Sequence, residues 1–208
     1  MQEKKLRVKH SAKKSKLPTA VYITTAVGFF VAVGYGLIVP AIPLFAKSFG
    51  VNNTAIGLIV STFAFARFST GFFIGKLVEK FGERLTLGVG LFLVALSTLF
   101  AGLAQSYWQL LFYRSFGGIG SMAFSVSANA ILMRVVSSEQ RGRAQATYNS
   151  GFLIGGMAGP AFGGILTAIS LRIPFFVYTV TLIIAGSVGL IYLSEKHLLH
   201  RDRDPIKS

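Results

Sequence analysis

The 208-residue sequence contains no cysteine, which excludes disulfide bonds, thiol nucleophiles and cysteine-ligated zinc. Acidic residues are also scarce, because seven Asp and Glu stand against 21 Lys and Arg. The three histidines, His10, His197 and His200, all lie near the two ends of the chain. With so few acids and imidazoles and no thiol, we expect neither a metal site nor a cofactor.

Motifs of the common enzyme classes are missing as well. The sequence has no GxxxxGK[ST] loop for a nucleoside triphosphate, no HExxH zinc motif and no GxSxG nucleophile motif. We therefore expect a protein that is not an enzyme and that has no nucleoside triphosphate site of its own. The basic residues form no basic-aromatic patch of the kind that binds nucleic acid, so no nucleic-acid partner is expected.

Apolar residues are abundant. Hydrophobic residues make up 52% of the chain and charged residues 13%, about half the share found in soluble domains. Apolar stretches of about 20 residues, long enough to cross a bilayer, alternate with short polar segments. They predict an all-α integral membrane protein with six transmembrane helices, at 19–46, 54–77, 85–104, 107–135, 143–169 and 174–194.

The distribution of basic residues predicts how these helices are oriented, because Lys and Arg concentrate in cytoplasmic loops. If both termini are cytoplasmic, that side holds seventeen Lys and Arg, whereas the outer side holds only Lys47 and Arg172. We therefore expect residues 1–18 to form a basic cytoplasmic tail and 19–194 to form the six-helix bundle in the cell membrane. Residues 195–208 are expected to form a second cytoplasmic tail.

Two positive charges fall inside the expected spans, Arg67 in 54–77 and Arg114 in 107–135, and none of the six spans contains Asp or Glu. An arginine at a helix centre costs about 2.5–3.5 kcal/mol on insertion scales. Each is either a structural arginine bonded to backbone carbonyls or a functional cation that binds an anion or acts on a nearby carboxylate. Arginine keeps its own proton, so it cannot carry the proton itself.

The segment GFLIGGMAGPAFGG, residues 151–164, combines helix-breaking and apolar residues. Gly151, Gly155, Gly159 and Gly163 recur every four residues and would form one groove without side chains along a helix, which lets another helix approach closely. Pro160 removes one backbone hydrogen bond, which a packed neighbour can tolerate. From the residues alone the groove is interpreted as static helix packing.

Four segments, in sequence order, resemble the signatures of one family. GKLVEKFGER at 75–84 is similar to the cytoplasmic Gly-x-x-x-Asp-Arg-x-Gly-Arg-Arg signature of major facilitator superfamily transporters, and RSFGGIGSMA from Arg114 to their Arg-x-x-x-Gly-x-Gly signature. GYGLIVPAIPLFAKSFG at 34–50 resembles the first helix of twelve-helix drug/proton antiporters. The antiporter signature Gly-x-x-x-Gly-Pro-x-x-Gly-Gly is matched by Gly155, Gly159, Pro160, Gly163 and Gly164. Over residues 18–193 the chain resembles the N-terminal six-helix half of such a transporter, and 195–208 resembles the start of its central loop.

The resemblance implies a conformational latch in the segment 75–84, which we expect to be a loop that follows a closely packed helix end at Gly75. Glu79 stands where aspartate is usual and Glu83 replaces a base. Glu79 would face the N-terminus of a helix in the opposite half and pair with nearby arginines. The expected latch residues are Gly75, Glu79, Lys80, Gly82, Arg84 and Arg141.

The resemblance also implies a role for Arg114 in proton coupling, with Arg67 as a second buried charge. It adds a second interpretation of the glycine groove, a hinge or sliding seal between two halves, whose other side would lie largely on a half that this sequence does not contain. Candidates for a substrate cavity are polar and aromatic residues of the spans, each of which would serve equally well in an interhelical hydrogen bond: Phe29, Tyr35, Ser121, Ser125, Asn129, Tyr148 and Asn149. Asn129 is favoured, because an amide can orient a ligand in an apolar wall.

Three functions stay open. The first is proton-coupled efflux of drug-like or amphipathic solutes by alternating access, with the proton-carrying acid in the other half. The second is a transporter subunit that works only as a homo- or heterodimer, for another solute, anionic ones included. The third is a truncated structural membrane protein without transport. The expected partners are membrane lipid, a small-molecule substrate, protons and a second six-helix half, either a separate chain or a second copy.

Overall fold

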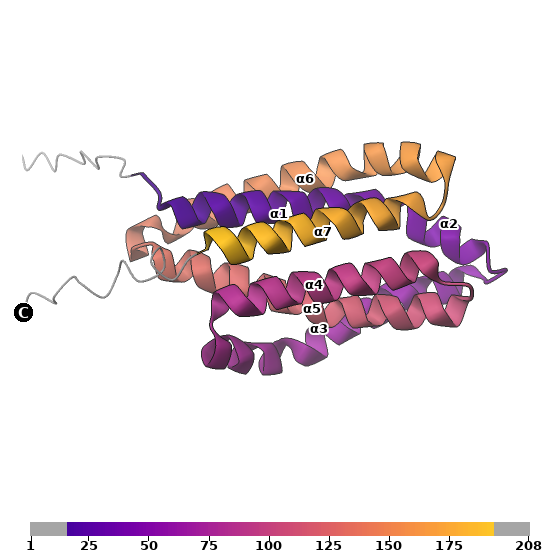
Figure 1. The fold of residues 1–208 in the computed structure, drawn as a ribbon, viewed down its shortest axis with the longest axis horizontal. Coiled ribbons are helices and arrows are strands. Elements are labelled where there is room, and N and C mark those ends of the chain that lie inside the picture. Colours follow the sequence, from indigo (N-terminus) through magenta and orange to yellow (C-terminus); the bar gives the residue numbers. More distant parts are fainter. Residues whose placement is uncertain (1–15, 194–208) are drawn as a thin grey trace, which may run out of the picture.

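The structure is a computed structural model that describes residues 16–193, and over those residues its regular elements are all helices (Figure 1). They are α1 (Thr19–Ile38), α2 (Ala41–Lys47), α3 (Asn53–Phe81), α4 (Glu83–Leu103), α5 (Tyr107–Val135), the short 3-10 helix η1 (Ser138–Gln140), α6 (Arg141–Ile169) and α7 (Ile173–Tyr192). Six segments are long and apolar enough to cross a bilayer, with α1 and α2 together forming the first. The predicted all-α fold with six spans is confirmed.

Two predicted boundaries are wrong for physical reasons. The first predicted helix is interrupted at Val39 and Pro40, because proline cannot donate the backbone hydrogen bond that would continue it. The helix expected to end near residue 77 continues to Phe81, so most of the predicted 75–84 loop is helical. Only Gly82 separates α3 from α4, and its φ of +82° is accessible to glycine. Gly75 lies inside α3, and a Cβ added there would meet nothing within 4 Å, so the predicted close packing at Gly75 is absent from the described chain.

The spanning helices form two groups of three, α1 with α6 and α7, and α5 with α3 and α4 (Figure 1). The groups meet mainly where α4 packs on α7, with a smaller contact between α1 and α5. Exchanging α1 with α5, α3 with α6 and α4 with α7 maps each contact within one group onto a contact within the other and leaves the two contacts between the groups unchanged. The packing therefore has the symmetry expected of a duplicated three-helix unit, although no repeat is visible in the residues themselves.

The groove of α6 is filled by α1 of the same chain. A Cβ on Gly155 would lie 2.5 Å from the Phe29 carbonyl oxygen, and one on Gly159 would lie 2.5 Å from Gly36 Cα. A Cβ on Gly163 would collide with the backbone of Leu37. The two helix backbones are thus in direct contact, as small residues at this spacing permit.

This contact corrects the expectation that the groove packs largely against another half. Gly151 continues the same row, since a Cβ there would lie 2.6 Å from Thr25 Cγ2. The open side of α6 is a different one. A Cβ on Gly156 or Gly164 would meet nothing within 4 Å. Within the antiporter signature, Gly155, Gly159 and Gly163 therefore pack against α1, whereas Gly164 lies on the open face of α6.

Two arginines fasten α4 to α7 at both ends. Near the start of α4, Arg84 donates from Nε to the Leu190 carbonyl oxygen at 2.6 Å, and its Nη2 donates to the same oxygen. Just before α7, Arg172 donates to the carbonyl oxygens of Gly102 at 3.1 Å and Ala104 at 3.0 Å, where α4 ends. Each cation lies at the C-terminal end of the other helix, where unpaired carbonyls carry partial negative charge.

Candidate functional site

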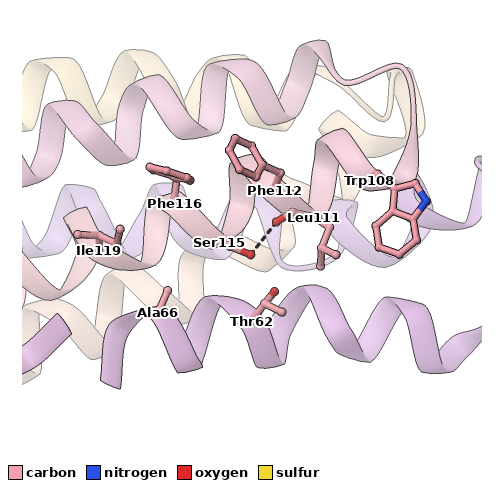
Figure 2. A pocket seen from close by; sticks show the side chains of 8 residues that line it. All are labelled: Thr62, Ala66, Trp108, Leu111, Phe112, Ser115, Phe116 and Ile119. Atoms are coloured by element: carbon pink, nitrogen blue, oxygen red, sulfur yellow. Dashed lines mark hydrogen bonds between the residues drawn. The ribbon is translucent and has the colours of Figure 1, made fainter. Parts of the chain in front are cut away.

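Two cavities of equal size differ in what they offer a solute. The first, of about 580 Å³, lies between α3 and α5 and is lined by Thr62, Ala66, Trp108, Leu111, Phe112, Ser115, Phe116 and Ile119 (Figure 2). Its two hydroxyl groups are already used within their own helices. Thr62 Oγ1 donates to Leu58 O at 2.8 Å, and Ser115 Oγ donates to Leu111 O at 2.7 Å. This groove is an apolar surface without a charged group to orient a ligand.

The second cavity, also about 580 Å³, lies where α1, α3, α5, α6 and α7 converge, and we call it the central cavity. Its lining residues are Val31, Tyr35, Val60, Phe63, Ala64, Arg67, Phe68, Ser121, Met122, Phe124, Ser125, Phe152 and Tyr178. Apolar and aromatic walls with a few convergent polar groups are typical of small-molecule sites. The central cavity is therefore the candidate functional site.

Arg67 reaches from α3 to α5 across one wall of this cavity. It donates from Nη1 to Ser121 Oγ and from Nη2 to Ser125 Oγ, the latter at 3.2 Å. The two serines are four residues apart, so they lie on one face of α5. Ser125 Oγ in turn donates to Ser121 O at 2.9 Å. The cation is thus held by neutral hydroxyl groups rather than by backbone carbonyls, and its charge is not balanced by them.

Arg114 adjoins the same cavity from within α5 and is only 3% exposed. Its Cζ lies 4.7 Å from the centre of the Phe63 ring, a cation–π contact, and Tyr35 and Tyr178 lie within electrostatic range. All three of these aromatic residues line the central cavity. Arg114 Nε has no hydrogen-bond partner in the part of the chain that the structure describes. This nitrogen therefore does not fit the first alternative for Arg114, a structural arginine bonded to backbone carbonyls.

Among residues 16–193 no carboxylate balances the two cations at the cavity. Between residues 16 and 193 the acids are Glu79, Glu83 and Glu139, all at helix ends or in the α5–α6 connection. None of them lines the central cavity. The site therefore has positive charge on apolar walls.

Comparison with known proteins agrees with this architecture. The family model of the Major Facilitator Superfamily matches residues 24–208. The chain belongs to the major facilitator superfamily. Quinolone resistance protein NorA of Staphylococcus aureus (strain MRSA252) is 29% identical over 185 residues, covering 86% of this chain and 44% of that protein. Multidrug resistance protein 2 of Bacillus subtilis (strain 168) is 28% identical over 176 residues, 84% of this chain and 44% of that one.

The fold matches a solved superfamily structure. The crystal structure of a bacterial homologue of the human lysosomal transporter Spinster, inward-facing and unoccupied, superposes with a TM-score of 0.72 at 19% identity. The match covers 82% of this chain and 42% of that one. This chain thus spans less than half the length of the relatives it matches. It is a multi-pass membrane protein with one six-helix unit of the major facilitator fold.

Some predicted cavity residues line the central cavity and others do not. Tyr35, Ser121 and Ser125 line it, together with Arg67. Asn129 is exposed, and its Nδ2 donates to Ser125 O at 2.8 Å. Asn149 is also exposed, and its Oδ1 accepts from Gln145 Nε2 at 3.0 Å. Phe29 and Tyr148 are likewise not among the lining residues, and Tyr148 packs against Gly28.

The sequence did not single out four aromatic lining residues: Phe63, Phe68, Phe152 and Tyr178. In an apolar helix, an aromatic residue that lines a cavity has the same sequence context as one that faces lipid. Phe68, at 85% exposed, illustrates the difficulty. Only the packing of five helices around one space distinguishes these residues.

The residues of the expected superfamily latch lie at one end of the bundle but do not form one cluster. Arg84 is bonded to Leu190, as described above, while Glu79, Lys80 and Arg141 are exposed. Within residues 16–193 Glu79 makes no ion pair, and its predicted pairing with nearby arginines stays a prediction for the assembled latch. Its predicted contact with a helix of another half stays a prediction.

Glu83, which departs from the superfamily signature, has a partner of its own. Both of its carboxylate oxygens accept from Arg134 Nη1 at 3.0 Å, which joins the start of α4 to the end of α5. The reversed charge at Glu83 is therefore matched by a cation of the same chain.

We expect Glu83→Arg to lower the free energy of unfolding by about 1 kcal/mol, because it places two cations together where a partly exposed ion pair stood. Adding Arg134→Glu restores the opposite charges and should recover most of the loss. Denaturant titration of the purified protein in detergent measures both. The matched control is Glu79→Arg, which breaks no ion pair among the described residues and should change little. An equal loss in the single and double variants would contradict the pairing.

Proposed function

We propose that this chain is one six-helix half of a secondary transporter that exports amphipathic, drug-like solutes in exchange for protons by alternating access. The central cavity carries the proposal, because five helices converge on an aromatic-lined space of about 580 Å³ with few polar groups. The names of the Staphylococcus aureus and Bacillus subtilis relatives, which refer to quinolone and multidrug resistance, support the class of solute. The superfamily membership supports the rocking of two bundles around a shared site.

The surfaces proposed to contact a second half are the least covered faces of this one. In the most apolar stretch of α3 only 6% of residues are buried, and in that of α6 only 22%, against 50% for α5 and 61% for α4. The open face of α6 includes Gly156 and Gly164. For proton-coupled export the second half is supplied either by the same polypeptide or by a different chain, because a second copy of this one would add no carboxylate within the spans of residues 16–193. A second copy remains the alternative for another, anionic solute. An axis along the membrane normal relates the two halves in this class of transporter, so a parallel homodimer has the required orientation.

The end of the bundle where α3 meets α4 is proposed to be cytoplasmic, as the count of basic residues favours. There the latch would be completed by the second half. Glu79 is exposed at the end of α3 and has no ion pair among residues 16–193, so it is available to the N-terminus of a helix in that half. Gly75, Lys80, Gly82 and Arg141 lie in the same region and are proposed to support that contact.

Proton coupling is proposed to depend on a carboxylate of the second half. None of the spans between residues 16 and 193 has an acid near its centre, and arginine does not release its proton under physiological conditions. Arg114 would act on that carboxylate through its charge. The chain by itself is therefore not expected to couple export to protons.

The test is a chimaera in which this chain replaces the matched region of the Staphylococcus aureus protein. Everted membrane vesicles containing the chimaera should accumulate a fluorescent quinolone, an amphipathic carboxylate, when a proton gradient is imposed and should lose that accumulation on addition of a protonophore. Vesicles containing only this chain should show no such uptake. Proton-driven uptake by this chain alone would refute the assignment of the acid to another half. Native mass spectrometry from lipid discs separates a monomer from a homodimer.

Glu79 provides an internal control in the same vesicles. Glu79→Gln should lower uptake by the chimaera several-fold without changing its folded yield, whereas Glu79→Asp, which restores the usual signature residue, should retain uptake. A chimaera that inserts, folds and shows no proton-driven uptake contradicts the transport proposal. That outcome would favour the structural, transport-inactive protein.

A further inference from the structure

We infer that Arg67, with Ser121 and Ser125, forms a subsite for the anionic head of the solute, so that the preferred ligands are amphipathic carboxylates. The inference rests on the proposed function in one respect, that the central cavity is where the solute binds. It goes beyond that function by naming the charge of the ligand and the residues that recognise it.

The first step concerns the hydrogen-bond donors of Arg67. A guanidinium has five N–H donors in a planar fork that matches a carboxylate. Two nitrogens of Arg67 donate to the serine hydroxyls, and no acceptor for the remaining donors is found in the described chain. Arg67 is only partly buried and lines the cavity, so these donors are accessible to a ligand. The serines fix the position of the guanidinium without neutralising it.

The second step concerns the field inside the cavity. Arg114, 3% exposed and with Nε unpartnered in residues 16–193, adds a second positive charge next to Phe63. No acid of the described residues lines the space. Because charges interact more strongly where water is excluded, an anionic ligand would be stabilised by both arginines and a cationic ligand would be repelled by both.

The third step concerns the rest of the ligand. Beyond Arg67 and the two serines, the polar groups in the lining are the hydroxyls of Tyr35 and Tyr178, and the remaining lining residues are aromatic or aliphatic. Sites of this volume accept drug-sized molecules. A ligand with an aromatic body and one carboxylate meets both parts of the site, with the rings of Phe68 and Phe152 available to its body. A ligand with several charges would bury the others against apolar walls without partners.

The experiment uses three probes with one ring system: 2-naphthoate, neutral 2-naphthamide and cationic 2-naphthamidine. Their binding to the full chain in phosphatidylcholine nanodiscs is measured by equilibrium dialysis, with empty nanodiscs as the blank. The Kd of 2-naphthoate should be at least about tenfold below that of 2-naphthamide, which corresponds to about 1.4 kcal/mol. The amidine should bind most weakly. This ranking needs no variant, and equal or reversed affinities, or no binding of any probe, overturn the inference.

Variants then assign the preference to Arg67. Arg67→Gln should bring the affinities for 2-naphthoate and 2-naphthamide together while keeping the affinity for 2-naphthamide, which reports that the cavity is intact. Arg134→Gln is the matched control, since Arg134 is 47% exposed outside the cavity and should leave the preference for the anion unchanged. A full preference in Arg67→Gln overturns the subsite. The binding assay uses no ion gradient, so it separates failure of this subsite from failure of the proposed proton-coupled transport.

Discussion

Gly159→Leu is expected to destabilise the six-helix bundle by about 3 kcal/mol or more, the upper range for overpacking. A Cβ at this position would lie 2.5 Å from both Gly36 Cα and the Val33 carbonyl oxygen, so even the first side-chain carbon has no room. The obstructing atoms are backbone and cannot move aside as a flexible side chain would. The measurement is the melting temperature and the folded, monodisperse yield of the protein purified in detergent.

Gly164→Leu is the matched control for this prediction. It makes the same change in the same helix, five residues further along, so the difference in helix propensity cancels. A Cβ at Gly164 would meet nothing within 4 Å, and we expect a change in stability within about 0.5 kcal/mol. Equal losses in the two variants would contradict the packing of α1 on α6. If Gly164 faces the proposed second half, Gly164→Leu should still lower quinolone uptake by the chimaera described above.

These two glycines illustrate what the sequence could and could not predict. A four-residue repeat identifies one face of a helix, and so it predicted that Gly155, Gly159 and Gly163 share a close contact. It does not identify the helix on the other side, which turned out to be α1 of the same chain. The signature therefore predicted the groove correctly and its partner wrongly.

The prediction of a loop at 75–84, most of which is helical, is wrong for a related reason. Hydropathy detects the interior of the bilayer, whereas a helix can continue beyond it. The last turns of α3 contain Lys76, Glu79 and Lys80, which are polar and resemble a loop by composition. The residue that does end the helix, Gly82, is recognised by its positive φ.

The central cavity was predicted in part. Tyr35, Ser121 and Ser125 were candidates for the cavity and line it, together with Arg67, which was predicted as a buried charge. Polar groups in apolar helices need partners, and Ser121 and Ser125 find theirs in Arg67 on the facing helix. Asn129 fails because its amide bonds to a carbonyl in its own helix, which satisfies the same requirement locally. Sequence alone does not show whether a polar side chain will bond to a partner on another helix or to a carbonyl of its own helix.

Arg114→Met should raise the stability of the purified chain by about 2 kcal/mol and abolish proton-driven uptake by the chimaera. Burying a cation without a carboxylate is costly, and the contact with the Phe63 ring returns only about 0.5–2 kcal/mol of it. Methionine is unbranched, flexible and apolar, so it can occupy the space without needing a hydrogen bond. A residue that lowers stability where it stands is consistent with selection for function rather than for folding.

Arg84→Met is the control for this prediction, because it should change the stability of the chain in the opposite direction. The substitution is chemically the same, but Arg84 donates two hydrogen bonds to the Leu190 carbonyl oxygen and fastens α4 to α7. Removing hydrogen bonds from a charged donor should lower stability by about 1.5–3 kcal/mol. Thermal denaturation in nanodiscs is therefore expected to shift in opposite directions for the two variants. If Arg114→Met melts lower than the unmodified chain, as Arg84→Met should, Arg114 is a structural residue and its proposed role in coupling loses its physical basis.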